Sequence, residues 1–440
     1  MRLSSSLVAL SCLAPTLLLS ACGTSVPLDN TAPPPTMESP DMAPSAAQDG
    51  AVSAPADFGD NGAPSNMYPA PFPDPPQVIS LRGAVLTAPR IIPIFFAGDD
   101  ANLAAKIADF SAKIGTSEFW KQTTSEYRVG PATSTPLVTI AETLANTVDD
   151  SAIQAWLAGK LNNNDPALPA LGPQDIFLIH YPANVTITFK YGGGVQKSCS
   201  SFGGYHSNIE LDAKHRHQTV AYAVIPRCKV NGSQLDALTV VDSHELTEAA
   251  TDPYPQTGPA YAQVDEDHFL WALLIGGGEV SDMCEALRDA NVKPQDLGYV
   301  VQRGWSNAAA KGGHNPCVPA PAGPYYNAVP EFNEYVDYYT GGVTYSLPGI
   351  NIPVGQSRTI TLDLFSDGPT APFTVNARNS RFSGTYLSFA LDRTTGVNGE
   401  KLHLTITSNS QSPRAGIPFV IESSLNGATY TWYGLVGQAQ

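Results

Sequence analysis

The sequence predicts a mixed α/β (α+β) domain followed by an all-β sandwich of immunoglobulin-like type. Over residues 78–322, short apolar runs typical of buried strands alternate with segments in which the apolar residues have helical spacing. Over residues 323–440 the helical spacing disappears, and alternating strands follow one another with turns between them. The chain has 440 residues, which is enough for two domains with separate cores.

The segment 1–21 is expected to be a lipoprotein signal peptide. Arg2 precedes an apolar stretch that ends in Leu19, Ser20 and Ala21, directly before Cys22. That ending resembles a bacterial lipobox, in which the cysteine carries lipid and becomes the first residue of the mature chain. The alternative is ordinary signal cleavage, with the cysteine as a bystander.

We therefore expect a protein that is anchored to the membrane by lipid on Cys22, on the extracytoplasmic side of the bacterial cell envelope. Gly23 is not the aspartate that would argue for inner-membrane retention, so an outer-membrane or outward-facing location is favoured. The net charge of -16 argues against nucleic-acid binding, because that function needs a basic surface.

The segment 22–77 is predicted to be a disordered tether. It is rich in proline, alanine, serine and aspartate and contains few large apolar side chains. Such a segment buries too little surface to offset the loss of chain entropy on folding. We expect it to link the lipid to the first domain.

The expected elements of both domains follow from the spacing of their apolar residues. In the first domain, strands are predicted at 90–98, 175–182, 184–191 and 219–228, and helices at 101–127, 152–161 and 233–253. Ser233 is suited to cap the last of these helices, with Asp236 three residues later, and Pro253 is expected to end it. In the second domain, strands are predicted at 357–368 and 400–410, and a hairpin at 417–437 around Asn426-Gly427.

Four further cysteines follow the tether, and in an exported chain they are expected to form two disulfides. Three pairings are possible, and proximity in the sequence favours Cys199 with Cys228 and Cys284 with Cys317. The alternatives are four buried thiols or a thiolate metal site. A zinc ribbon is disfavoured because no C-x-x-C pair occurs.

The stretch VVDSHELTEAATDP, residues 240–253, is the main candidate for a functional site. His244 and Glu248 are spaced to share one face of the predicted helix, where both can bind one metal ion. Glu245 is the candidate general base. The apolar neighbours predict that this helix is buried, and buried carboxylates need a cation or a hydrogen-bond network. The network is the structural alternative to a metal.

A third ligand is expected from GGGEVSDMCEAL, residues 276–287. Glu279 is the favoured ligand, and Asp282 is expected to orient His244, as in one group of zinc proteases. Asp252 is the rival third ligand, because it continues the same helix face. The proline that follows it disfavours helical structure at that position.

Two neighbouring residues in SFGGYHSNIEL are further catalytic candidates. His206 follows a flexible pair of glycines and can reach the site as an electrophile or as a fourth ligand. Tyr205 is a candidate for stabilising an oxyanion. The alternative for the histidine is an ordinary surface or packed position.

Two acidic motifs resemble those of the phosphate-induced, EXORDIUM-like secreted proteins known from plants, HELTE at 244–248 and EVSDMCE at 279–285. The segments SCSSFGGYHS at 198–207 and RGWSNAAAKGGHNPC at 303–317 are similar to further segments of that family. The resemblance covers about residues 78–320 and implies a secreted zincin-like fold. The chain departs from the family in its lipobox and tether, in Asp252 where the family has asparagine, and in its C-terminal sandwich.

Together these features predict a cell-surface lipoprotein with a zinc-dependent hydrolase domain of peptidase type, acting on a peptide or a cell-wall polymer. One divalent metal is expected, with zinc favoured, although a carboxylate-rich donor set also suits manganese, iron or calcium. One alternative is a non-catalytic binding or adhesion protein of the envelope in which the site is structural. Another is a purely structural surface protein without a metal.

Overall fold

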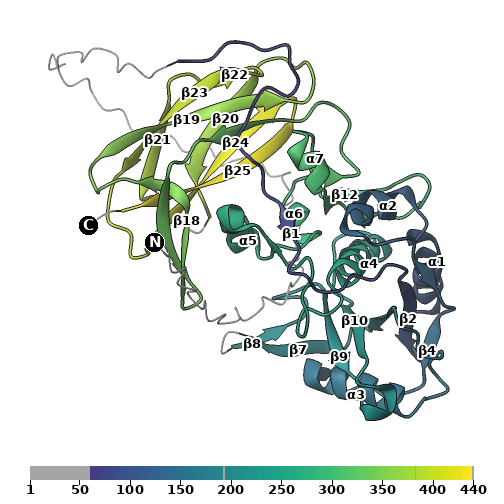
Figure 1. The fold of residues 1–440 in the computed structure, drawn as a ribbon. Coiled ribbons are helices and arrows are strands. Elements are labelled where there is room, and N and C mark those ends of the chain that lie inside the picture. Colours follow the sequence, from purple (N-terminus) through teal and green to yellow (C-terminus); the bar gives the residue numbers. More distant parts are fainter. Residues whose placement is uncertain (1–59, 192–193, 382, 439–440) are drawn as a thin grey trace, which may run out of the picture. The chain divides into compact units, whose positions relative to one another are not determined.

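The computed structural model describes residues 60–191, 194–381 and 383–438 (Figure 1). The signal peptide, Cys22 and tether residues 22–59 lie outside the described residues. The described chain forms two compact units, one made of residues 74–323 and the other of residues 60–73 together with 324–438. The first unit ends beside the predicted domain boundary at 322/323. Among the described residues, no helix is long and apolar enough to cross a membrane.

The first unit is built on a mixed sheet with the strand order β3-β2-β6-β10-β9, in which β4 also pairs with β2. Its strands are β2 (Arg90–Phe96), β3 (Thr133–Ser134), β4 (Val138–Ile140), β6 (Asp175–Tyr181), β9 (Tyr205–Glu210) and β10 (Thr219–Pro226). The strands β2, β6 and β10 are parallel, and β9 runs antiparallel along the edge of β10. The central strands are mostly apolar and buried because both faces of the sheet are covered.

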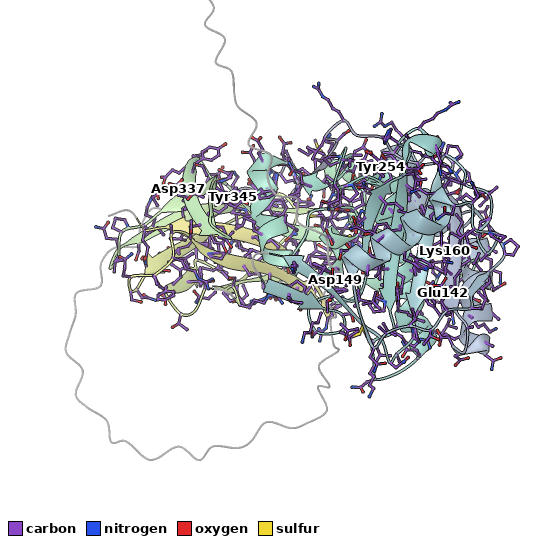
Figure 2. All side chains as sticks on the ribbon, turned by 90° about the horizontal axis from the view of Figure 1, so that it is seen from below. Glu142, Asp149, Lys160, Tyr254, Asp337 and Tyr345 are labelled. Carbon is purple, nitrogen blue, oxygen red and sulfur yellow. A yellow bond between two sulfur atoms is a disulfide. The ribbon has the colours of Figure 1, made fainter. Side chains whose placement is uncertain are left out.

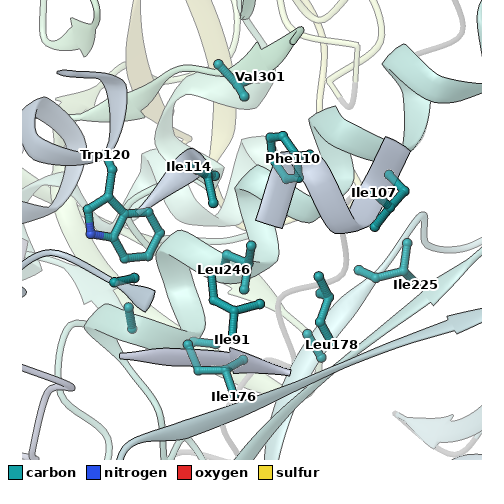
Figure 3. Close-up of a cluster of buried hydrophobic side chains, with 14 of the residues drawn as sticks. Ile91, Ile107, Phe110, Ile114, Trp120, Ile176, Leu178, Ile225, Leu246 and Val301 are labelled. Atoms are coloured by element: carbon teal, nitrogen blue, oxygen red, sulfur yellow. The ribbon is translucent and has the colours of Figure 1, made fainter. Parts of the chain in front are cut away.

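Helices α1 (Ala101–Ile114) and α4 (Gln234–Thr251) pack on one face of this sheet, and α3 (Asp150–Asn162) packs on the other. On the first face, Leu246 of α4 lies over Ile176 and Leu178 of β6 (Figure 3). On the second face, Lys160 of α3 forms an ion pair with Glu142 at 2.6 Å (Figure 2). Because side chains alternate along each strand, each central strand contributes apolar side chains to two separate cores, one on each face of the sheet.

The helix predicted at 101–127 is in fact broken into three pieces. After α1 come α2 (Glu118–Thr124) and the 3₁₀ helix η1 (Ser125–Tyr127). Gly115 ends α1 where the chain approaches Ala132 so closely that a Cβ would lie 2.3 Å from the carbonyl oxygen of that residue. Ser117 then starts a new helix by accepting a hydrogen bond from the Trp120 backbone N–H.

The other elements of the first unit are short and surround the sheet. A three-stranded sheet contains β5 (Thr147–Asp149), β7 (Thr186–Tyr191) and β8 (Gly194–Lys197). The paired short strands are β1 (Val78–Ile79), β11 (Gln263–Val264), β12 (Asn291–Val292), β13 (Val301–Gln302), β14 (Gly304–Trp305) and β15 (Cys317–Val318). The remaining helices are η2 (Ala213–His215), η3 (Glu266–His268), α5 (Phe269–Ile275), α6 (Asp282–Glu285) and α7 (Asn307–Lys311). The disulfides Cys199–Cys228 and Cys284–Cys317 confirm the favoured pairing.

The second unit confirms the predicted all-β sandwich. One sheet has the order β16-β19-β23-β21, with β16 (Tyr326–Pro330), β19 (Ser357–Ser366), β21 (Leu387–Leu391) and β23 (Lys401–Ser408). The other has the order β17-β18-β25-β24-β20-β22, with β17 (Glu334–Thr340), β18 (Val343–Asn351), β20 (Phe373–Asn379), β22 (Thr395–Gly396), β24 (Ile417–Leu425) and β25 (Ala428–Gly437). Asn426 and Gly427, both with positive φ, form the predicted hairpin turn between β24 and β25.

The prediction of a disordered tether is wrong for its last part, residues 60–77. Residues 60–73 pack on the sandwich, where Phe72 stacks on Phe365 with ring centroids 4.1 Å apart. The Asn398 side chain binds this segment by accepting a hydrogen bond from the Ala70 N–H and donating to the Met67 carbonyl. Residues 60–73 contain too few large apolar side chains to form a core of their own. They are ordered because they pack on the core of the sandwich and form hydrogen bonds with the buried Asn398 amide.

Candidate metal centre

Helix α4 carries the candidate site on a side that is closed off from solvent. The helix begins after Ser233, whose hydroxyl accepts from the Asp236 N–H, and ends before Pro253, as the sequence predicts. One side packs into the core through Leu238, Leu246, Ala249 and Ala250. The other side carries His244, Glu245 and Glu248, and all three are 0% exposed.

Strand β9 brings His206 to this helix and directs Tyr205 away from it. In the register with β10, His206 pairs with Ala223, which belongs to the core beneath α4. Tyr205 pairs with Val224 and packs into the core on the opposite face, where its hydroxyl donates to Asp150 Oδ1 at 2.6 Å. The expectation that Tyr205 stabilises an oxyanion is therefore wrong, because its hydroxyl lies on the other side of the sheet.

Glu279 reaches the same place from the loop between α5 and α6, and Asp282 reaches it from the first position of α6. The Glu279 backbone N–H donates to Asp282 Oδ2 at 3.1 Å, and the Asp282 backbone N–H donates to Glu248 Oε1 at 3.2 Å. Gly277 makes this packing possible, since a Cβ there would lie 2.0 Å from Asp282 Oδ2. Gly204, directly before β9, likewise allows the chain to pack closely against α4, since a Cβ there would lie 2.9 Å from Glu245 Oε1.

Histidine and glutamate side chains converge in the space between these elements. His244 Nε2 lies 3.1 Å from Glu248 Oε2, and His206 Nδ1 lies 3.7 Å from both Glu248 Oε2 and Glu245 Oε2. On its other side, His206 Nε2 lies 3.6 Å from Glu279 Oε2. Two trios of potential ligands result, which share one glutamate: His206, Glu248 and Glu279, and His244, Glu245 and Glu248.

The predicted ligand set His244, Glu248 and Glu279 is therefore brought to one place, but it is divided between the two trios. The residue that connects Glu279 with Glu248 is His206, which the sequence offered only as an electrophile or a fourth ligand. All of these residues are at most 3% exposed. A lone surface histidine is thus excluded as the role of His206.

Asp282 does not orient His244 in the expected way. Its Oδ1 lies 3.6 Å from Nε2, the ring nitrogen that faces Glu248, and not beside Nδ1. The partner of Nδ1 is Gln302 Oε1 at 3.1 Å. The orienting role therefore falls to an amide of β13, and Asp282 instead supports Glu248 and Glu279 through hydrogen bonds that involve its backbone N–H and its carboxylate.

Asp252, the rival third ligand, forms hydrogen bonds at the C-terminal end of α4. Its Oδ1 accepts from the Ala260 N–H at 2.6 Å, and its backbone carbonyl accepts from His206 Nε2 at 3.1 Å. Burial raises the pKa of its carboxyl to about 7, although the hydrogen bond from Ala260 opposes the shift. The Asp252 backbone carbonyl thus fixes the His206 ring through Nε2.

Burial controls the protonation of the whole cluster. It raises the pKa of Glu245, Glu248 and Glu279, and the neighbouring carboxylates raise these values further. Burial lowers the pKa of His206 to about 3, so this imidazole is neutral. For His244, burial acts to lower the pKa, but Glu248, Glu245 and Asp282 together outweigh it, and the pKa lies well above its usual value.

Several buried acceptor atoms of the cluster have no hydrogen-bond donor among the described residues. They are His206 Nδ1, His244 Nε2, both oxygens of Glu245, Glu248 Oε2, Asp252 Oδ2 and Glu279 Oε2. A buried polar atom without a partner costs about 1–3 kcal/mol, and a charged one costs more. Positive charge in this one space, from a bound cation or from protons on the cluster itself, would balance these atoms.

The spacing of these atoms fits a divalent ion. Ligands bonded to zinc at about 2.0–2.2 Å in a tetrahedral arrangement lie about 3.3–3.6 Å from one another. The contacts from His206 and His244 to the glutamate oxygens are 3.1–3.7 Å long. Two imidazoles and several carboxylates are also donor types that zinc, manganese and iron accept.

Three residues that hold the cluster were not predicted from the sequence. Gln302 accepts from His244, Ser281 Oγ donates to the His244 carbonyl at 3.2 Å, and Ser243 Oγ accepts from the Gln302 N–H at 2.9 Å. Ser281 lies inside the motif that carries Glu279, which is the one signal that could have drawn attention to it. The amide of Gln302 has no such signal, because only the fold brings β13 beside α4.

Comparison with protein-family models and with curated proteins finds no match for this chain. Solved structures share limited similarity with it. The titin M3 domain aligns at 8% identity and a TM-score of 0.16, covering 26% of this chain and 100% of that chain. Domains 5–6 of the S-layer protein SbsC align at 15% identity and a TM-score of 0.16, covering 26% of this chain and 45% of that chain. A family 123 glycoside hydrolase from Clostridium perfringens aligns at 8% identity and a TM-score of 0.18, covering 26% and 28%. Similarity at this level carries no inference about the site.

Proposed function

We propose that the unit formed by residues 74–323 is a zincin-like, metal-dependent hydrolase of the bacterial cell surface, with peptidase-type chemistry on a peptide or a cell-wall polymer. The observation that carries this proposal is the convergence of buried acceptor atoms that have no donor. A bound cation would balance such a set without a further side chain. The resemblance of both acidic motifs to the EXORDIUM-like family supports the same assignment.

In this proposal, His244, Glu248 and Glu279 hold one divalent ion. When bound, the ion supplies a Lewis acid that polarises the scissile carbonyl. Zinc is the favoured ion, although the carboxylates make the donor set harder and also suit manganese or iron. Gln302 keeps the His244 proton on Nδ1, so that Nε2 presents its lone pair.

Glu245 is the proposed general base. It follows His244 on α4, and neither of its oxygens has a hydrogen-bond donor among the described residues. Burial raises its pKa well above the usual value, so the carboxyl is a stronger proton acceptor than a free glutamate. It would take a proton from the attacking water and return it to the leaving amine.

The proposed cellular setting follows from the N-terminal sequence. Lipid on Cys22 would anchor the chain to the envelope, and the segment 22–59 would separate the anchor from the folded units. Both disulfides suit an extracytoplasmic compartment. The sandwich, for which an immunoglobulin-like type is proposed, would then present the hydrolase or bind envelope material.

One observation favours a second candidate function, a non-catalytic envelope protein with a structural metal. His206, His244 and the glutamates are all buried, so in this conformation the site offers no exposed donor to a substrate. Closed sites with only protein ligands are typical of structural zinc, whereas catalytic zinc keeps a position for water. The two candidates share the ion and differ in what Glu245 does.

The substitution Glu245→Gln separates them. A chain carrying Cys22→Ser, which prevents lipidation, would be incubated with a peptide library and analysed by mass spectrometry, with metal content measured on the same sample. We expect the variant to keep about one equivalent of metal and to lose about 10²–10⁴-fold in cleavage rate. Glu266→Gln, at an exposed glutamate of the same unit, is the matched control. A metal-loaded wild-type chain that cleaves nothing, or a variant that cleaves normally, would overturn the hydrolase assignment.

A further inference from the structure

The two histidines of the cluster are held in opposite tautomers. Gln302 Nε2 donates to the Ser281 carbonyl at 2.9 Å, and a carbonyl only accepts, so this interaction fixes which end of the amide is the donor. Gln302 Oε1 is therefore the acceptor for His244 Nδ1 at 3.1 Å. Nδ1 carries the proton, and in the neutral ring Nε2 carries the lone pair.

The reverse holds for His206. Its Nε2 lies 3.1 Å from the Asp252 backbone carbonyl, which also only accepts, so Nε2 is the protonated nitrogen. Nδ1 then carries the lone pair, and it has no hydrogen-bond donor among the described residues. Asp252 lies at the C-terminal cap of α4, so the helix that carries His244 also fixes the ring of His206.

Both lone pairs face the same oxygen atom. Glu248 Oε2 lies 3.1 Å from His244 Nε2 and 3.7 Å from His206 Nδ1, and it too has no donor. Three acceptors that point at one another repel unless a positive species lies between them. A proton on His244 satisfies one of these contacts, but it leaves Nδ1 of His206 without a partner.

We propose that His206 is a metal ligand through Nδ1 and shares the ion of the proposed site with His244 and Glu248. This inference rests on the proposed metal site and adds to it a residue that the acidic motifs do not include. Glu279 Oε2 lies 3.6 Å from Nε2, the protonated nitrogen of His206, so this glutamate contacts the ring on its Nε2 side.

The test is cobalt binding to the full chain with Cys22→Ser, after removal of other metals with a chelator. Cobalt(II) is used because its visible absorption is strong with four ligands and weak with six. We expect about one equivalent to bind to the wild-type chain with strong absorption. In His206→Ala, we expect an affinity at least about tenfold lower and weaker absorption, because water replaces the imidazole. Added imidazole should restore the absorption.

His217→Ala is the matched control, since this histidine is exposed. If His206→Ala fails to fold, the same cobalt spectrum is measured for His206→Gln, whose side chain is similar in volume to histidine. No cobalt bound to the wild-type chain would overturn both the metal site and this inference. One equivalent with unchanged affinity and absorption in the His206 variants would overturn this inference alone. Two equivalents in the wild-type chain would assign His206 to a second ion and overturn the shared site.

Discussion

Removal of the proposed divalent ion is expected to destabilise the first unit, because the site concentrates acidic side chains away from water. Glu245, Glu248 and Glu279 are buried within one cluster, and burial raises the pKa of each. Their ionised forms therefore lower the free energy of unfolding unless a cation balances them. A chelator should lower the unfolding temperature, and zinc or manganese should restore it.

The size of this effect follows from linkage between binding and folding. An ion at about a hundred times its Kd that binds only the folded state adds about 2.7 kcal/mol to the free energy of unfolding. A domain of this size shifts its Tm by about 2–4 °C for each kcal/mol, so the expected difference is about 5–11 °C. The difference should grow as the pH rises, because the ligands must lose their protons to bind.

Differential scanning calorimetry of the full chain with Cys22→Ser measures this difference directly. The Glu279→Gln variant should lose most of the ion-dependent shift, whereas Glu266→Gln, at an exposed position, should keep it. If the Tm is the same with a chelator and with zinc, manganese or calcium, the reasoning fails. The cluster would then be a polar network held together by a proton shared between His244 and Glu248.

Three further predictions concern the residues around the cluster. Gly204→Ala places a methyl group 2.5 Å from Val241 Cγ1, so we expect a loss of about 1–3 kcal/mol in urea unfolding, and an unchanged midpoint would contradict this close approach. Asp242→Ala leaves buried His180 without the hydrogen-bond partner that lies 2.9 Å away, so we expect a loss of about 1–3 kcal/mol in the same assay. A loss no larger than that of a surface substitution would show that the pair is dispensable. The pKa of Asp252 rises from 3.8 to about 7 on folding, so between these values only the folded state binds this proton. The stability of the metal-free chain should therefore fall as the pH rises towards 7, and Asp252→Asn should reduce this slope.

The sequence predicted those parts of the site that lie on one helix. Ser233 and Pro253 define both ends of α4, and the spacing of His244 and Glu248 places them on one face. These signals are local, so they do not depend on how the rest of the chain folds. The long helix predicted at 101–127 was wrong for a non-local reason, the close approach of Gly115 to Ala132.

The contribution of β9 could not be predicted in the same way. Side chains alternate along a strand, so the choice between His206 and Tyr205 depends on the register with β10. A shift of one residue would have placed the tyrosine in the site. Gln302 is harder still, because it is distant from His244 in the sequence and only the packing of β13 against α4 brings them together.

In the proposed metal site, the surrounding architecture would position the ligands before any ion binds. The elements that add His206 and Glu279 to α4 are each held by a disulfide, since Cys199 lies shortly before His206 and Cys284 shortly after Glu279. Repulsion among buried carboxylates would otherwise drive these elements apart. In an oxidising compartment the disulfides oppose that repulsion, and the backbone approaches at Gly204 and Gly277 leave no room for the carboxylates to turn away. A packing network would not need carboxylates forced so close together. A binding site for a cation does, because preorganised ligands cost less to assemble when the ion arrives.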